Sequence, residues 1–166
     1  MKARRGDLSG PVLAILVTLI LLAIGAVIIA YFTLLAGPAP TPVLVVKDQP
    51  IAYKSDGNAV VEVVVANIGT ANVTLKSGSG KTRLIITGPS GLVTALNAAG
   101  GPGDTKTLSD DTAIAPGSSV TLTFTFTGGW DEFAPYRSAS ARLVLVDKAD
   151  NTIAQFEVSI RIIGGG

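Results

Sequence analysis

The 166-residue sequence contains no cysteine and no histidine. Within this chain, their absence excludes zinc and blue-copper sites built on thiolate or imidazole ligands, Ser–His and Cys–His nucleophiles, thiol redox chemistry and disulfide bonds. Charged residues are scarce at 15%, and the formal net charge is only +1. A nucleic-acid-binding protein normally carries a basic excess, so we expect no nucleic-acid partner. We likewise expect no enzyme activity, no cofactor and no metal ion.

Hydrophobic residues make up 48% of the sequence, and many of them fall in one segment. Residues 12–36 contain no charged side chain, and sixteen of these 25 residues are Leu, Ile, Val or Phe. A helix of this length would extend about 37 Å, enough to cross a hydrocarbon core of about 30 Å. The composition favours membrane insertion by about 5–10 kcal/mol. We therefore predict a transmembrane helix rather than the core helix of a soluble domain.

The flanks of this segment predict its orientation. Lys2, Arg4 and Arg5 precede it, whereas residues 37–42 (GPAPTP) after it carry no charge. The positive-inside rule then places the amino end in the cytoplasm and the rest of the chain outside. Proline removes a backbone donor and restricts the residue before it, so residues 37–42 are predicted to end the helix as a stiff linker.

The hydrophobic period changes to two in residues 43–166, which we call the head domain. Val120–Thr127 alternates strictly between apolar residues and threonine. Further short strands are predicted at residues 59–66, 83–87, 142–146 and 153–163, separated by turn residues. We predict an α+β chain: a long apolar N-terminal helix followed by an antiparallel β-sandwich head, immunoglobulin-like in outline. No second helix is expected, and residues 97–111 are predicted to form a long surface loop.

Three groups of head residues have side chains that could form a chemical site. Residues 77–82 (SGSGKT) resemble the end of a phosphate-binding loop, but Leu75 stands where the pattern requires glycine and a strand follows, so we predict a hairpin turn. Asp104, Asp110 and Asp111 match no calcium-loop spacing and indicate a solvated acidic loop.

The third group is the adjacent pair Asp131 and Glu132, since two carboxylates can form the catalytic pair of a sugar-cleaving enzyme. Adjacent residues of a strand or turn point to different sides, so we predict no catalytic pair here. We expect an exposed cluster of Trp130, Phe133 and Tyr136, which indicates a packing or subunit-contact patch. Asn72-Val73-Thr74 is an N-glycosylation pattern, and the predicted topology places it outside the membrane.

The first residues, Met-Lys-Ala-Arg-Arg-Gly-Asp-Leu-Ser-Gly-Pro, place basic residues and a glycine directly before the apolar segment. This order resembles the class III signal peptide of archaeal type IV pilins and archaellins. The resemblance covers about residues 3–36, and over the head domain it is only architectural. It departs from bacterial pilins, which carry a glutamate at mature position five, where this chain has Pro11.

The resemblance implies cleavage by a prepilin peptidase between Gly6 and Asp7, which would remove Lys2, Arg4 and Arg5. Residues 1–6 would then be the leader, 7–36 the helix that forms the filament core, 37–42 the linker and 43–166 the displayed head. It further implies self-assembly into a helical homopolymer with the help of an assembly platform, at the archaeal cell surface. The helix residues expected to pack in the filament core are Val12, Leu13, Leu16, Leu19, Ile20, Ile24, Val27, Ile28 and Phe32.

The sequence is compatible with two functions from different classes. The first is a structural subunit of an adhesive pilus or an archaellum, and the modest head favours adhesion. The second is an uncleaved, membrane-anchored β-sandwich that binds the surface layer, similar to archaellum accessory proteins. A tethered cupredoxin-type electron carrier is disfavoured because its copper ligands would be His and Cys.

Overall fold

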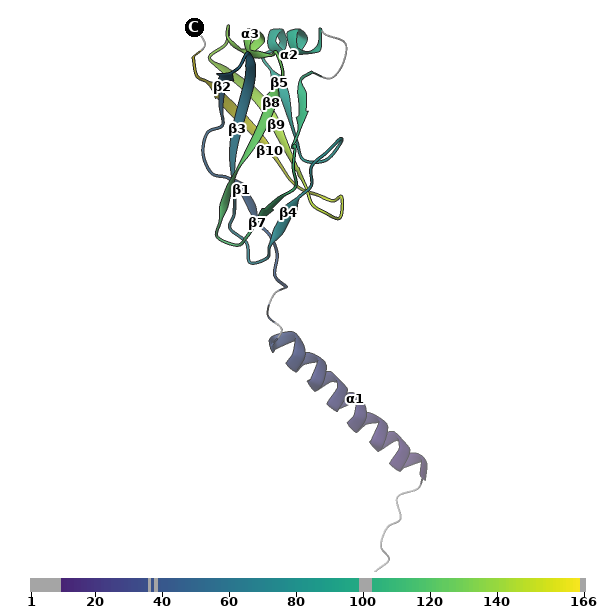
Figure 1. Cartoon of the computed structure of the whole chain (residues 1–166). Helices are drawn as coiled ribbons and strands as arrows, with labels where there is room; N and C mark the ends of the chain where they lie inside the picture. The colour runs from purple at the N-terminus through teal and green to yellow at the C-terminus, as the bar shows by residue number, and fades with distance from the viewer. Residues whose placement is uncertain (1–9, 36, 38, 99–102, 165–166) are drawn as a thin grey trace, which may run out of the picture. The chain divides into compact units, whose positions relative to one another are not determined.

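The computed structural model describes residues 10–35, 37, 39–98 and 103–164 (Figure 1). The chain divides into two compact units, Met1–Ala39 and Pro40–Gly166. In the first unit, α1 spans Gly10–Leu35. Pro11 lies in its first turn, where the missing N–H has no helical partner to lose. The structure confirms the predicted apolar helix, because α1 is long and apolar enough to cross a membrane.

The second unit contains the head domain and is mostly β-structure, as the alternating sequence predicts. Its strands are β1 (Leu44–Val46), β2 (Ile51–Ser55), β3 (Asn58–Asn67), β4 (Val73–Leu75), β5 (Arg83–Gly88), β6 (Thr105–Thr107), β7 (Thr112–Ile114), β8 (Ser119–Phe126), β9 (Ser138–Val146) and β10 (Thr152–Ile162). The strands expected near residues 59–66, 83–87, 120–127, 142–146 and 153–163 correspond to β3, β5, β8, β9 and β10.

The strands form a sandwich-like arrangement with two layers. One layer, which we call the β3 layer, contains β1, β2, β3 and β8, and the other contains β5, β6, β9 and β10. Strand β3 pairs with β8 along one edge and with β1 and β2 along the other, while β10, β9, β5 and β6 follow one another in order. Strands β4 and β7 form a separate two-stranded sheet. The antiparallel prediction is wrong at one place, because β2 and β10 run parallel, with Ile51 and Ala52 opposite Arg161 and Ile162. Parallel neighbours need a long connection, and almost the whole head lies between these two strands.

One hydrophobic core lies between the two layers. Leu122, Phe124 and Phe126 of β8 face it, as the alternation with threonine predicts. Leu143 of β9 and Ile160 of β10 contribute from the other layer. The core therefore uses one face of each strand, and this leaves the opposite faces of both layers as the surface of the head domain.

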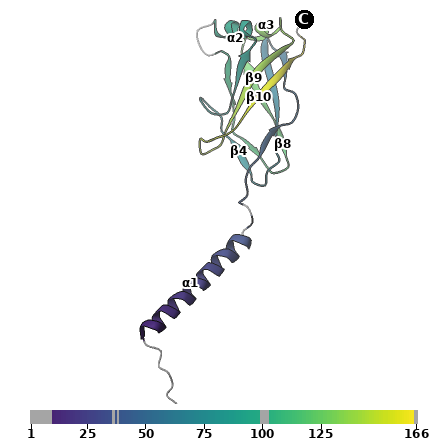
Figure 2. The ribbon, with the colours of Figure 1, turned by 180° about the vertical axis from the view of Figure 1, so that it is seen from behind.

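Two short helices correct the expectation that the head has no helix. Helix α2 spans Ser90–Asn97 and α3 spans Trp130–Phe133. Leu92 and Leu96 are buried at i and i+4 of α2, a helical spacing too short to stand out between strands. Both views show α2 and α3 together at one end of the head domain, with β4 towards the other end (Figure 1, Figure 2).

Two loop predictions also need correction. The expected long loop at residues 97–111 contains β6, which pairs with β5, and the buried Leu108. A three-residue strand is held by its neighbour rather than by its own pattern, so the sequence did not reveal it. Residues 77–82 form no hairpin turn, because the strands that they connect, β4 and β5, belong to different sheets.

Candidate functional site

Helix α1 presents apolar side chains on every side. Over Gly10–Thr33 all residues are exposed except the half-buried Gly25. The nine residues expected to pack in a filament core are between 46% and 67% exposed: Val12, Leu13, Leu16, Leu19, Ile20, Ile24, Val27, Ile28 and Phe32. A helix without a polar face has no side that favours water, so α1 requires lipid or protein all around it.

The two threonine hydroxyls of α1 are satisfied within the helix. The Thr18 hydroxyl donates to the carbonyl oxygen of Ala14 at 2.9 Å, and the Thr33 hydroxyl donates to that of Ile29. An unpaired hydroxyl in an apolar surrounding costs free energy, and these bonds remove that cost. Both threonine hydroxyls of α1 can therefore enter an apolar environment with their hydrogen bonds already made.

Gly25 opens a shallow groove on α1. Thr18, Leu21, Leu22, Ala26 and Ile29 line it together with Gly25. A Cβ atom placed on Gly25 would meet nothing within 4 Å, so the helix itself does not require glycine here. Glycine in a helix interior costs about 1 kcal/mol relative to alanine. Small residues at such positions allow the backbone of a second helix to approach closely.

The proposed processing site lies outside the described residues. This holds for the basic residues Lys2, Arg4 and Arg5 and for the scissile pair Gly6 and Asp7. The described residues of this region begin at Gly10, the first residue of α1.

Asn67 anchors the start of the head domain, and the sequence did not single it out. Its buried amide nitrogen donates to the carbonyl oxygens of Ala71, at 2.7 Å, and Ile114, at 3.1 Å. Its side-chain oxygen accepts from the backbone N–H groups of Gly69, at 3.0 Å, and Val43, at 3.3 Å. One side chain thus ties the first residues after the linker to β3 and β7.

Gly69 completes this anchor through a close backbone approach. A Cβ atom on Gly69 would lie 2.3 Å from the carbonyl oxygen of Thr41 and 2.4 Å from the backbone nitrogen of Val43. The N–H of Thr70 donates to Thr41 at 2.9 Å, and the N–H of Ile68 donates to Val43 at 2.8 Å. The chain from Thr41 onward is therefore fixed to the head rather than free.

The predicted glycosylation residue lies on the surface near this anchor. Asn72 is exposed, whereas the next residue, Val73, is buried in β4 and Thr74 is half-buried. An exposed amide that directly precedes a strand is sterically open to modification.

The acidic residues of the head take part in no common site. The structure places no group of three metal-ligating side chains within ligand distance among the described residues. Asp111 instead accepts hydrogen bonds from the backbone N–H and the hydroxyl of Ser77, at 2.7 and 2.9 Å. Asp131 and Glu132 lie in the first turn of α3.

The aromatic patch predicted for packing or subunit contact belongs to the core. Trp130 and Phe133 are 5% and 0% exposed, and the partly buried Tyr136 packs against the hydrophobic core. Phe133 also contacts Phe126, with ring centroids 5.3 Å apart. The packing interpretation is therefore confirmed, whereas the expected exposure is wrong for Trp130 and Phe133, which are not available to a neighbouring subunit.

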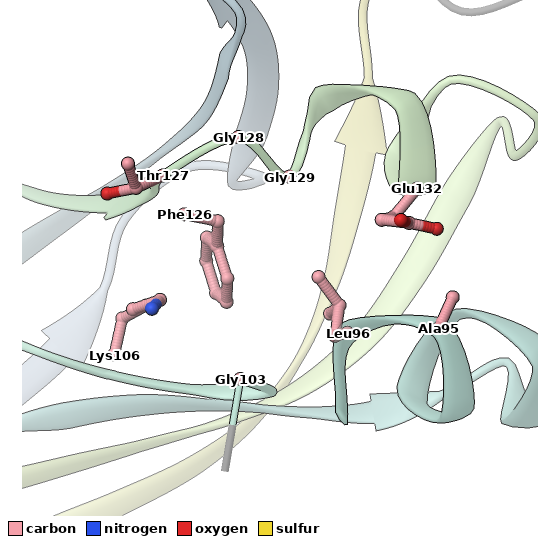
Figure 3. Close-up of a pocket in the computed structure, with 9 residues that line it drawn as sticks. All are labelled: Ala95, Leu96, Gly103, Lys106, Phe126, Thr127, Gly128, Gly129 and Glu132. Carbon is pink, nitrogen blue, oxygen red and sulfur yellow. The ribbon is translucent and has the colours of Figure 1, made fainter. Parts of the chain in front are cut away.

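A hollow lies beside this aromatic cluster, between α2, α3 and the end of β8 (Figure 3). Lys106 lies on one side, with its ammonium 5.7 Å from the centre of the Phe126 ring, and Glu132 lies on the other. Its volume of about 210 Å³ is below the range of about 300–1,000 Å³ found for ligand pockets. We assign no chemistry to it.

Two exposed carboxylates give the head domain a defined response to acid. The pKa of Asp150 is lowered below its ordinary 3.8 by a hydrogen bond from the Lys76 ammonium, at 2.7 Å, and by a second one from the Lys81 ammonium, at 3.0 Å. The hydrogen bonds from Ser77 lower the pKa of Asp111 in the same way. Because both pKa values are lower in the folded state, their contribution to stability is present above pH 3.8 and is lost as the pH falls through the folded values.

We therefore expect the unfolding temperature of the head to fall modestly when the pH decreases from about 4 to about 2. The Asp150→Asn and Asp111→Asn variants should show a weaker dependence, measured by the fluorescence of Trp130. Asp110→Asn is the matched control, since the Asp110 side chain makes no hydrogen bond to the described residues. An unchanged pH profile in the double variant Asp111→Asn/Asp150→Asn would contradict this assignment.

The sequence matches no known protein-family pattern and no characterised protein sequence at a significant level. Among solved structures, the ApaA protein from Bordetella pertussis is 17% identical, with a TM-score of 0.35, covering 74% of this chain and 98% of that one. A β-glucosidase from Listeria innocua, in complex with glucose, is 12% identical, with a TM-score of 0.31, covering 74% of this chain and 16% of the enzyme. These values are too low to indicate a shared fold family or activity.

Proposed function

We propose that this chain is a structural subunit of an archaeal type IV pilus-like surface filament, with a role in adhesion. In this proposal the leader is cleaved between Gly6 and Asp7, and the subunits polymerise through α1. The observation that carries the proposal is the helix itself: its side chains are apolar all round and exposed in the isolated chain. The resemblance of residues 3–36 to class III signal peptides and the helix that follows them supports it.

The physical argument concerns where the apolar surface of α1 is buried. In the membrane, lipid covers this surface; in a filament, the helices of neighbouring subunits cover it. Exposure to water would forfeit the roughly 5–10 kcal/mol that favours insertion. Subunits therefore pass directly from the bilayer to the base of the filament, which requires an assembly platform in the membrane as a partner.

Removal of the leader prepares the helix for this second environment. Cleavage after Gly6 would remove three basic residues and no acidic one, which changes the formal net charge from +1 to −2. Unpaired basic side chains cost several kcal/mol each when they are buried in protein. A prepilin peptidase is therefore the expected second partner, and the mature subunit belongs on the outer cell surface.

For the head domain we propose an immunoglobulin-like strand order, displayed to the medium. In that fold, strands A, B and E share one sheet and C, F and G share the other. The order β1/β2, β3, β8 resembles A, B, E, and the order β5, β9, β10 resembles C, F, G. We also propose that Asn72 carries an N-linked glycan, in keeping with its exposure and its sequence pattern.

The cleavage proposal predicts a single mature amino terminus. Mass spectrometry of surface material should find Asp7 as the first residue, and Gly6→Val should block processing because a branched side chain hinders access to the scissile bond. Gly25→Val, the same substitution within α1, is the matched control and should be processed normally. An intact Met1 in assembled fibres, or normal processing of Gly6→Val, would contradict the site.

The alternative function is an uncleaved, membrane-anchored binding module that faces the surface layer. It shares the membrane-spanning role of α1 but predicts retention of Met1 and a monomer or small oligomer. Electron microscopy of the purified surface material separates the two functions, because only the filament proposal predicts fibres.

A further inference from the structure

The outer face of the β3 layer carries a distinct set of side chains. We call it the threonine–valine face, defined by Thr121, Thr123 and Thr125 of β8 and Val60, Glu62 and Val64 of β3. The register places these residues directly opposite one another, as Thr121/Val64, Thr123/Glu62 and Thr125/Val60. The face continues onto β2, where Ile51 lies opposite Glu62 and Tyr53 opposite Val60.

Very little charge lies on this face. Glu62 is the one charged residue among its defining members, and it accepts a hydrogen bond from the Tyr53 hydroxyl at 2.8 Å. Lys47 borders the face just beyond β1. The outer face of the other layer differs, because Arg142 of β9 and Glu157 of β10 form an ion pair there at 2.6 Å.

Strand β3 has the composition of a strand that is covered on both faces. Seven of its ten residues are Ala or Val. Val61, Val63 and Val65 are 0% exposed and face the core. Strands with one face in solvent normally alternate with polar residues, whereas near-continuous apolar strands lie between two layers. On the outer face of β3, Val60 is 7% exposed and Glu62 and Val64 are half-buried, whereas the three threonines beside them on β8 are exposed.

Strand β8 is also an unprotected edge. It pairs with β3, and the described residues contain no other strand paired with it. Soluble proteins usually protect such edges with charged residues, proline or a β-bulge. The eight residues of β8 contain neither a charged residue nor proline, and their pairing with β3 is regular. The edge and the face thus offer one continuous surface for contact.

We propose that the threonine–valine face is the contact through which the head domains of neighbouring subunits pack in the filament; this proposal rests on the filament function above. Three strands about 4.8 Å apart and up to ten residues long give a face of about 15 by 30 Å. Its area of about 450 Å² is well below the roughly 800 Å² per partner of stable complexes. It therefore suits copies of the chain that α1 already holds together at high effective concentration.

The lack of cysteine allows a direct test in the full-length chain. Thr123→Cys places a single thiol on the threonine–valine face, and Ser140→Cys places one on an exposed strand position of the opposite face. In detergent-solubilised monomers, both thiols should react with a maleimide at similar rates. In filaments, we expect labelling of Thr123→Cys to slow at least about tenfold, because buried thiols are shielded from reagent. Ser140→Cys should label at an unchanged rate.

The outcomes separate this proposal from the filament function itself. Fibres in which Thr123→Cys labels as fast as in monomers would overturn the contact and leave the filament intact. Absence of fibres from the unsubstituted chain would overturn the filament function, and the contact with it. If the Thr123→Cys chain does not assemble, Thr121→Cys provides a second thiol on the same face. Slow labelling of Thr121→Cys in filaments, together with fast labelling of Ser140→Cys, then supports the proposal.

Discussion

Replacement of Ile20 by arginine is expected to abolish filament assembly while leaving the chain in the membrane. Ile20 lies near the middle of α1 and is 49% exposed in the isolated chain. An arginine at the centre of a transmembrane helix costs about 2.5–3.5 kcal/mol on the insertion scale, less than the roughly 5–10 kcal/mol that favours insertion. The Ile20→Arg chain should therefore still insert, with its side chain reaching towards the interface.

In a filament the same arginine meets protein on every side. A buried charge without a partner costs several kcal/mol, and that cost recurs at every subunit. Ile20→Leu is the matched control, since it keeps an apolar side chain of the same size and should assemble normally. Membrane fractionation measures insertion and electron microscopy measures fibres. Fibres from Ile20→Arg in normal numbers would show that burial of α1 is not the contact that organises the filament.

The sequence predicted α1 well because its evidence is local and redundant. Twenty-five consecutive uncharged residues indicate a membrane-length helix whatever the rest of the chain does. Strands β3, β8, β9 and β10 were predictable for a similar reason, since each keeps its core-facing residues at a spacing of two over many residues. The proposed processing site would depend on recognition by another protein, so the fold of this chain does not bear on it.

The elements that the sequence did not reveal depend on tertiary contacts. Strand β6 forms because β5 supplies its hydrogen bonds, and α2 forms because Leu92 and Leu96 fit into the core at one end of the sandwich. Asn67 looks in the sequence like an ordinary turn residue at the end of an apolar strand. Its role appears only when Val43 and Ile114, distant along the chain, meet its side chain.

Asn67→Leu is expected to destabilise the head domain strongly. Leucine has a similar size but leaves the carbonyls of Ala71 and Ile114 and the N–H groups of Gly69 and Val43 without their partner. A fully buried group without a partner costs about 1–3 kcal/mol. The bond to Ile114 is buried and the other three are part-buried, so the four together imply a loss of about 2–4 kcal/mol. Most domains are stable by only about 5–15 kcal/mol in total.

Asn58, at the other end of β3, provides the matched control, because its side-chain oxygen accepts one exposed hydrogen bond from Gly128, at 2.9 Å. Asn58→Leu should cost no more than about 1.5 kcal/mol. Unfolding of the detergent-solubilised full chain can be followed through Trp130, the single tryptophan, which is 5% exposed. Trp130 lies in α3, so a large shift for Asn67→Leu would also show that the anchor near the linker and the helical end unfold together. Equal unfolding temperatures for the two variants would mean that the Asn67 hydrogen bonds do not hold the first residues of the head in place.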